Sequence, residues 1–290
     1  MVPVVVKVSP EEVVSIKGLL SRQMGVVSLQ VTNQYEIFRV KYAESFIVGY
    51  SSGKIVVNNE EARKLLSKLL NELHGELTKP LIIGSDEAGK GEWLGPMVVA
   101  AVAVSPEREL ELQTRGVMDS KELSLSKIKE LSEYVTTNNF VTSYVVITPS
   151  RFNELFIVLK DENKTLNDLL AWGHSKVIDD VYSKVSISTK DIRVIIDEFD
   201  RIRTEDRLRR LLDLKRIEVI QEPRAERNIA VAAASIVARD TREKYIDYQS
   251  KEFKKDLRKL TVESALKDTY SFAYAKLPYL EKIANRVNEV

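Results

Sequence analysis

Apolar and polar positions over the first 75 residues predict a series of short elements. The apolar run over 4–8 is typical of a strand, and Pro10-Glu11-Glu12 opens an amphipathic helix that extends to about Arg22. Stretches rich in β-branched and aromatic residues, separated by turn residues, then predict four antiparallel strands over 26–32, 35–42, 46–50 and 54–57. A second helix is expected over 59–73. Both helices would cover one face of a sheet, and the open face would bind a ligand or pack against the rest of the chain.

From Leu81 onward the pattern changes to alternating strands and helices, which is typical of an α/β domain with a mixed sheet. A hairpin of two antiparallel strands is expected over 81–88 and 95–104. Further strands are predicted over 140–147, 192–196 and 217–220. Helices are predicted over 123–135, 150–159, 164–182 and 203–213, and a long helix from about Ala225 is followed by helical segments to the C-terminus.

Composition narrows the possible chemistry. The chain has 290 residues, 44% of them hydrophobic, which suits one large or two modest domains. Its net charge is +1, so nucleic-acid binding would require local basic patches. With no Cys and two His, carboxylates are the natural metal ligands, and they favour hard cations. No signal peptide is recognisable and no apolar run reaches the ~18 residues of a membrane span, so a cytoplasmic protein without a membrane partner is expected.

Two neighbouring carboxylates, Asp86 and Glu87, stand between a buried strand and a glycine-rich turn. Burying an unpaired charge costs roughly several kcal/mol, so these residues need a counter-ion, a shifted pKa or a bound metal. Lys90 is a candidate counter-ion, and additional acids at the same place would favour a divalent cation. Successive strand residues point to opposite faces, so the two acids can share a site only where the strand twists or ends.

The glycines of this segment have a second possible interpretation. Gly84, Gly89 and Lys90 fit the spacing of a nucleotide-binding P-loop, but Gly91 stands where that motif needs Ser or Thr. Asp86 and Glu87 would also lie inside the loop and repel a triphosphate. We therefore interpret the glycines as turn residues of a hairpin.

Other acids follow predicted strands or open helices. Asp197 comes directly after the apolar residues Val194-Ile195-Ile196, which places it at the sheet rim, where it either serves a site or caps a turn. Glu226 opens a long run of small and apolar residues, and the helix dipole alone would also favour an acid there. Asp240, expected on the solvated part of that helix, is a reserve ligand.

Four segments together resemble the type 2 ribonucleases H: GSDEAGKGEWLGP, VMDSKEL at 117–123, IIDEF at 195–199 and RAERNIAVAAASIVARD at 224–240. Within this family the chain is most similar to ribonuclease HIII, and YSSGKIVV at 50–57 and YAKLPYLEKI at 274–283 fit that group. The resemblance implies a ribonuclease H-like catalytic domain over 81–290, an α/β mixed sheet flanked by helices. A small α+β TATA-binding-protein-like domain over 1–75 would precede it and bind substrate.

The resemblance also implies a site and a reaction. Carried over position by position, the family's metal-binding and catalytic acids fall on Asp86, Glu87, Asp197 and Glu226, although many members have Asp at the fourth position. Two Mg²⁺ or Mn²⁺ ions would be bound, with Asp86 bridging them, Glu87 and Glu226 on one ion and Asp197 on the other. A monomer would then cleave the RNA strand of RNA/DNA hybrids to 5′-phosphate and 3′-hydroxyl ends.

Substrate contacts are expected in two places. Backbone groups of Gly89, Lys90 and Gly91 would read the ribose 2′-hydroxyl, which distinguishes RNA from DNA. Ribonuclease HII enzymes have Gly-Arg-Gly here, so this departure favours the HIII group. Lys121 either contacts a phosphate or belongs to a helix start that Asp119 or Ser120 caps.

Some polar residues and two functional alternatives stay open. Ser85 either orients a ligand or packs, whereas His174 and Trp172 are interpreted as belonging to the surface and core of a helix rather than as catalytic groups. The chain is alternatively a ribonuclease HII-type enzyme that incises at single ribonucleotides in duplex DNA. A protein that binds hybrids without cleaving them is the second alternative, although clustered acids would repel phosphates unless a metal is present.

Overall fold

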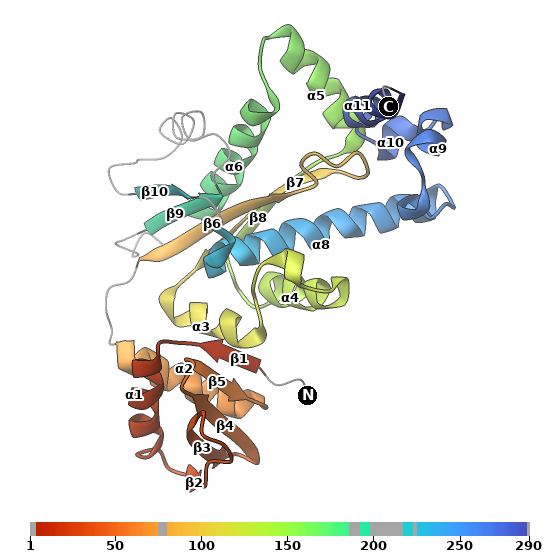
Figure 1. The fold of residues 1–290 in the computed structure, drawn as a ribbon. Helices are drawn as coiled ribbons and strands as arrows, with labels where there is room; N and C mark the ends of the chain where they lie inside the picture. The colour runs from red at the N-terminus through yellow and green to blue at the C-terminus, as the bar shows by residue number, and fades with distance from the viewer. Residues whose placement is uncertain (1–3, 75–79, 186–191, 198–216, 223–224, 289–290) are drawn as a thin grey trace. The chain divides into compact units, whose positions relative to one another are not determined.

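The computed structural model describes residues 4–74, 80–185, 192–197, 217–222 and 225–288. The chain forms two compact units, each with its own sheet and apolar core (Figure 1). Unit 1 comprises residues 1–79 together with 105–117, and unit 2 comprises residues 80–104 together with 118–290.

Unit 1 contains an antiparallel sheet of five strands in the order β1-β5-β4-β3-β2. Its elements match the predicted series: β1 (Val4–Lys7), α1 (Pro10–Leu20), β2 (Val27–Leu29), β3 (Glu36–Tyr42), β4 (Ser45–Tyr50), β5 (Lys54–Val57) and α2 (Glu60–His74). Alternate strand residues such as Phe38, Val40 and Ile47 form one core with apolar residues of α1 and α2. Both helices therefore cover the same face, as predicted, and exposed Val5 and Phe46 lie on the other.

Unit 1 also includes helix α3 (Pro106–Arg115), which the apolar pattern did not predict. Leu110 joins the core of unit 1, and Arg115 Nη2 lies 3.0 Å from Glu60 Oε1 of α2. The helix begins with a proline in its first turn and ends at Gly116, whose φ of 89° gives a left-handed C-terminal cap. The residues at its two ends therefore determine where the helix starts and stops. Its place in unit 1 depends instead on contacts with residues distant in the sequence.

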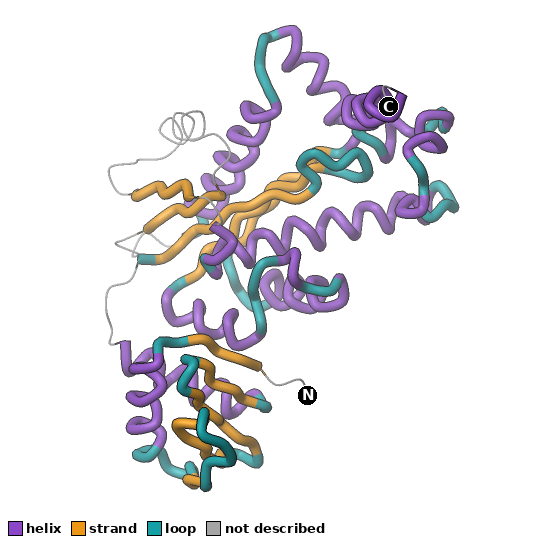
Figure 2. The backbone as a smooth tube through the Cα atoms, in the orientation of Figure 1, coloured by secondary structure: helices purple, strands orange, loops and turns teal. Residues whose placement is uncertain are grey.

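Unit 2 contains a mixed five-stranded sheet in the order β10-β9-β6-β7-β8. The strands are β6 (Leu81–Ala88), β7 (Met97–Val104), β8 (Thr142–Ile147), β9 (Ile192–Asp197) and β10 (Ile217–Glu222). β6 pairs antiparallel with β7 and parallel with β9, and β10 pairs parallel with β9. The predicted mixed sheet with two antiparallel first strands is thus confirmed, and Figure 2 shows its strands side by side.

Helices of unit 2 lie on both faces of this sheet. They are α4 (Leu125–Thr137), α5 (Pro149–Asp161), α6 (Leu166–Tyr182), α8 (Ile229–Glu252), α9 (Val262–Lys267), α10 (Ser271–Tyr274) and α11 (Leu277–Asn288), with short 3-10 turns η1 (Ser120–Glu122), η2 (Ala225–Arg227) and η3 (Leu257–Lys259). The helix predicted over 203–213 lies outside the described residues. None of the helices within the described ranges combines the length and apolar character of a transmembrane segment.

Helices α6 and α8 lie on opposite faces of β6, and both approach the sheet closely. A side-chain carbon added at Gly84 of β6 would stand 2.2 Å from the Ala230 carbonyl carbon in the backbone of α8. On the other face, a carbon added at Gly173 of α6 would stand 2.9 Å from Val99 Cγ2 of β7. Small residues at these two points therefore set the distance of each helix from the strand that carries Asp86 and Glu87.

Candidate functional site at the end of strand β6

Strand β6 carries Asp86 and Glu87 on opposite faces, as the alternation of strand side chains requires. Asp86 faces α8, where Ser235 hydrogen-bonds to it, and Glu87 faces α6, where it meets His174. The strand ends at Ala88, immediately after the two acids. Both carboxylates therefore reach the rim of the sheet from its two sides, which answers how neighbouring strand residues share a site.

A hollow of about 500 Å³ lies at this rim. Three of the predicted acids, Asp86, Glu87 and Asp197, line it together. Basic residues line it as well: Lys90, Lys121, Arg239 and Arg242. Carboxylates from two parallel neighbouring strands thus converge with cationic side chains, an arrangement suited to an anionic substrate bound through a cation.

Asp86 is placed where its ionised form is unfavourable. Burial raises its pKa to about 8, and the nearby carboxylates of Glu87 and Asp197 act in the same direction. Hydrogen bonds from the Ser235 hydroxyl and from the Glu87 amide, the latter at 2.8 Å, oppose the shift without cancelling it. A cation bound beside Asp86 would remove this penalty.

Glu87 is held by two nitrogen groups. Its Oε2 lies 3.1 Å from His174 Nε2 and its Oε1 lies 3.3 Å from Lys90 Nζ. Burial raises the pKa of Glu87, but the hydrogen bond and charge of His174, together with Lys90, outweigh burial and make the net shift downward. Lys90 is therefore the counter-ion that the sequence suggested. The sequence alone assigned His174 to the surface and core of a helix together with Trp172, whereas His174 is fully buried and contacts the site directly.

Asp197 ends strand β9, next to β6 in the sheet. Its Oδ1 accepts a hydrogen bond of 3.2 Å from the Ala225 amide in turn η2. Glu226 is the next residue, so the backbone of the fourth predicted ligand runs beside Asp197. The Glu226 side chain lies outside the described residues. Helix α8 begins at Ile229 with Asn228 as its N-cap, so Glu226 precedes the helix instead of opening it as predicted.

The donor set determines which cations suit the hollow. Among the described side chains, no three acids or histidines stand close enough to enclose a metal as they are. Asp86, Glu87 and Asp197 nevertheless share one hollow and offer only carboxylate oxygens, which are the ligands that Mg²⁺ and Mn²⁺ prefer. The raised pKa of Asp86 is consistent with a site whose charge is balanced by a cation.

The turn after β6 has the glycine conformations that the sequence predicts. Gly89 and Gly91 have φ of 83° and 76°, and a side-chain carbon at Gly89 would stand 2.3 Å from the Pro96 carbonyl oxygen. Two basic side chains hold the following residues. Arg242 Nη2 donates to the Leu94 carbonyl at 3.0 Å, and Lys276 Nζ donates to the Gly95 carbonyl at 2.6 Å. Backbone amides of the turn are thus presented by a firmly held loop.

Residues near Lys121 connect turn η1 to helix α8. Asp119 caps η1 by accepting a hydrogen bond of 2.9 Å from the Lys121 amide, which is the capping that the sequence left open. Ser120 Oγ lies 2.9 Å from Ser235 Oγ, and Arg239 donates to the Ser120 carbonyl. Lys121 is exposed and lines the hollow, so capping and substrate contact are compatible roles.

The reserve ligand Asp240 lies away from the hollow. It is buried, where the sequence predicted a solvated position, and its Oδ2 lies 2.7 Å from Lys244 Nζ one turn along α8. Asp240 does not line the hollow at β6. Asp240 is therefore a buried acid outside the hollow, with which the acids of the hollow can be compared.

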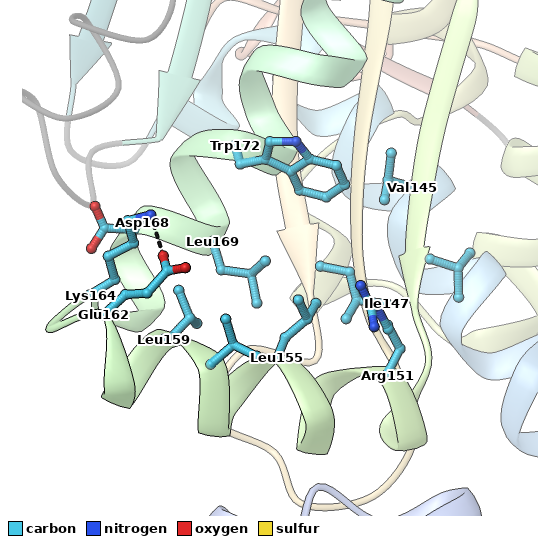
Figure 3. A pocket seen from close by; sticks show the side chains of 12 residues that line it. Val145, Ile147, Arg151, Leu155, Leu159, Glu162, Lys164, Asp168, Leu169 and Trp172 are labelled. Carbon is cyan, nitrogen blue, oxygen red and sulfur yellow. Dashed lines mark hydrogen bonds and ion pairs between the residues drawn. The ribbon is translucent and has the colours of Figure 1, made fainter.

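A second hollow, of about 400 Å³, lies between β8, α5 and α6 (Figure 3). Its lining is mainly apolar, with Leu155, Leu159, Leu169 and a half-exposed Trp172 around it. Its charged rim residues have local partners, since Lys164 pairs with Glu162 at 2.5 Å. None of the predicted site residues lines this hollow.

Comparisons with known proteins point to one family of nucleases. A family model described as Ribonuclease HII matches residues 83–263. The ribonuclease HIII of Protochlamydia amoebophila is 35% identical over 226 residues, covering 72% of this chain and 70% of that protein. The ribonuclease HII of Methanocaldococcus jannaschii is 34% identical over 180 residues, covering 59% and 76%. The crystal structure of Bst-RNase HIII in complex with Mn²⁺ covers 98% of this chain and 100% of that chain, with a TM-score of 0.58 and 23% identity. This last likeness confirms the predicted fold.

Proposed function

The chain belongs to the ribonuclease HII and HIII family, and from that membership we propose that it is an endonuclease that hydrolyses the RNA strand of RNA/DNA hybrids. The products would carry 5′-phosphate and 3′-hydroxyl ends. The observation that supports this proposal most directly is the hollow where Asp86, Glu87 and Asp197 meet four basic side chains. A protein that only bound hybrids would gain nothing from three carboxylates facing the phosphates.

We assign the binding of two divalent cations to Asp86, Glu87, Asp197 and Glu226. When bound, Mg²⁺ or Mn²⁺ supplies an activated water and neutralises the departing 3′-oxygen. The protein's own residues prepare the ligands: Ser235 orients Asp86, His174 and Lys90 orient Glu87, and the Ala225 amide orients Asp197. Oriented carboxylates bind a cation more tightly because less side-chain freedom is lost on binding.

Substrate recognition is assigned to the turn and to unit 1. Amides of Gly89, Lys90 and Gly91 can approach a ribose closely, because glycine carries no side chain and the loop is held by Arg242 and Lys276. Lys121 would contact a backbone phosphate. The outer face of the unit 1 sheet, with exposed Phe46 and Val5 and no Asp over residues 1–75, would add hybrid affinity. Action as a cytoplasmic monomer stays a prediction.

Ribonuclease HII activity is the second candidate, because the matching family model and the Methanocaldococcus jannaschii relative are both of that type. The two candidates differ in substrate. An HIII-type enzyme cuts an all-RNA/DNA hybrid at many sites and cuts poorly at a single ribonucleotide within duplex DNA. Lys90 in place of the HII-type Arg between the two glycines favours the first preference.

The test compares both substrates with the full-length protein in Mg²⁺ and Mn²⁺, and again with EDTA. We expect metal-dependent cutting of the hybrid, loss of activity in Asp86→Asn and Asp197→Asn, and retained hybrid binding by both variants. Asp240→Asn is the matched control, since it neutralises a buried acid outside the hollow and should leave cleavage unchanged. Preferential cutting at the single ribonucleotide would instead assign the HII activity, and binding without metal-dependent cleavage would overturn the nuclease proposal.

A further inference from the structure

His174 is a buried polar residue whose two ring nitrogens are both engaged. It lies in helix α6, none of its surface is exposed to solvent, and Nε2 lies 3.1 Å from Glu87 Oε2. On the other side of the ring, Nδ1 lies 2.8 Å from Ser85 Oγ. Ser85 Oγ in turn lies 2.9 Å from the Ala100 carbonyl oxygen of β7. A continuous chain of hydrogen bonds therefore runs from the sheet backbone through the imidazole to the carboxylate.

The imidazole is fixed by the packing of its helix. Gly173, the preceding residue, allows α6 to approach β7, since any side chain there would meet Val99. The neighbouring apolar residues Leu170, Val177 and Ile178 are fully buried in the core beneath the sheet. A ring carried by such a helix cannot swing away from Glu87 without moving the core. The direction in which Nε2 points is therefore set by the fold.

The two partners of Glu87 differ in what they can fix. Lys90 belongs to the turn, and its side chain is 38% exposed, so its ammonium group is held loosely. His174 is enclosed, and its ring is held at Nδ1 by Ser85. An ionised carboxylate only accepts hydrogen bonds, so the contact at Nε2 is a donation from the ring to Oε2. This contact is made to Oε2, so a ligand would approach Oε1, which faces the partly exposed Lys90 side chain.

We propose that His174, supported by Ser85, is a positioning residue that fixes the Glu87 carboxylate for metal binding. The inference rests on the proposed function, because it takes Glu87 as a metal ligand. Partners that orient a ligand side chain typically change metal affinity by about 10–100-fold when they are removed. A core residue with no such role would change folding stability and leave the metal affinity of the folded protein unaltered.

The test measures Mn²⁺ affinity of the full-length protein by calorimetry, with circular dichroism to confirm folding. His174→Leu and His174→Asn should each weaken Mn²⁺ binding about 10–100-fold, because neither retains a donor at the position of Nε2. His174→Gln should recover most of the affinity, since its longer amide can donate to Glu87. If His174 only filled space in the core, the Asn and Gln variants should bind Mn²⁺ with equal affinity, because both bury similar amides.

Ser175→Ala is the matched control. Ser175 is the next residue of α6, it is equally buried, and its hydroxyl makes no hydrogen bond within the described part of the chain. Its Mn²⁺ affinity should equal that of the wild type. In hybrid cleavage, His174→Asn should lower kcat at limiting Mn²⁺ and recover at saturating Mn²⁺, with the KM for hybrid unchanged.

Wild-type Mn²⁺ affinity in folded His174→Leu would overturn the proposal. Should that variant not fold, Ser85→Ala tests the same chain of contacts with a smaller change in volume. It should weaken Mn²⁺ binding several-fold, and unchanged affinity would equally count against the proposal. The proposed function fails separately, through hybrid binding by the wild-type protein without metal-dependent cleavage. If Asp86→Asn is inactive and the His174 variants bind Mn²⁺ normally, only the positioning role is lost.

Discussion

Gly84 is the position where one added methyl group should disturb both stability and activity. In Gly84→Ala, the new carbon would stand 2.2 Å from the backbone of α8 at Ala230 and Val231, against the 3.4 Å or more of an ordinary contact. Helix α8 would therefore have to move away from β6 by about 1.2 Å. Both partners are backbone in a buried core, so no side-chain rotation relieves the overlap.

Overpacking of this kind costs about 1–3 kcal/mol, and backbone against backbone belongs at the upper end. A loss of about 3 kcal/mol would lower the melting temperature of unit 2 by roughly 6–12 °C. Because α8 carries Ser235, which hydrogen-bonds to Asp86, hybrid cleavage should fall as well. Differential scanning calorimetry and a cleavage assay on the full-length protein measure the two effects.

Gly18→Ala provides the comparison. Gly18 lies in helix α1, and a side-chain carbon there would meet no atom within 4 Å. This substitution should stabilise unit 1 by about 0.5–1 kcal/mol, because alanine favours a helix over glycine. A Gly84→Ala protein that melts and cleaves like the wild type would refute the reasoning, since it would mean that α8 and β6 are not packed as closely as described.

Three other substitutions test the electrostatics. In EDTA at pH 7, Asp86→Asn should raise the free energy of unfolding by about 2 kcal/mol, well below the ~6 kcal/mol that the full displacement of the Asp86 pKa represents. Folded Asp86 keeps its proton up to about pH 8, whereas unfolded Asp86 loses it at about pH 4. The stability gain of the variant over the wild type should therefore grow from pH 4 to 8, as measured by urea unfolding. Lys255, the Tyr270 amide and Tyr274 lower the pKa of Asp268 to about 2, so the ionised carboxylate stabilises the fold above pH 4. Asp268→Asn should lose this stability, and the difference in unfolding free energy between wild type and variant should vanish as the pH falls to 2. Burial lowers the pKa of Lys276 to about 7, so the stability of the wild type should rise from pH 7 to 10 relative to that of Lys276→Met. Parallel curves of unfolding free energy against pH for the two proteins would contradict this.

The sequence predicts that Asp86, Glu87 and Asp197 meet at one rim of the sheet, because their positions follow from strand ends. Asp86, Glu87 and Asp197 each come at the end of an apolar run, and neighbouring parallel strands bring such ends to one edge of a sheet. The packing of α8 against β6 is also encoded, through the small residues from Ile229 to Ser235 and through Gly84. These features depend on local pattern and on the geometry of a sheet.

His174 had no comparable signal. It lies 87 positions after Glu87 in the chain, within a helix whose buried face is apolar, and a buried histidine there is indistinguishable from a core residue. Only the register of α6 on the sheet shows that Ser85 and Glu87 point to the same helix. The Gly173-His174 pair was the one local hint, because a glycine inside a helix often marks close packing.

Helix α3 was not predicted, and the start of α8 was placed too early, because local end signals were given less weight than the apolar pattern. Helix α3 has only Leu110 and Leu112 as apolar residues, so it lacks the periodicity that predicts a packed helix. Its start at Ser105-Pro106 and its end at Gly116 were readable, and they are the signals that should have outweighed the weak apolar pattern. At α8, the Asn228 cap fixes the start of the helix after Glu226, where the small-residue run alone predicted an earlier start.

The membership of α3 in unit 1 determines where this protein can be cut. The chain leaves the N-terminal unit at residue 79, builds the β6–β7 hairpin, and returns with residues 105–117 before continuing into unit 2. A fragment ending at residue 79 would lack Leu110 from its core and the partner of Glu60. A fragment beginning at residue 80 would contain α3 but lack the core of unit 1 against which Leu110 packs. Separate production of either half therefore calls for a permuted or grafted helix rather than a single truncation point.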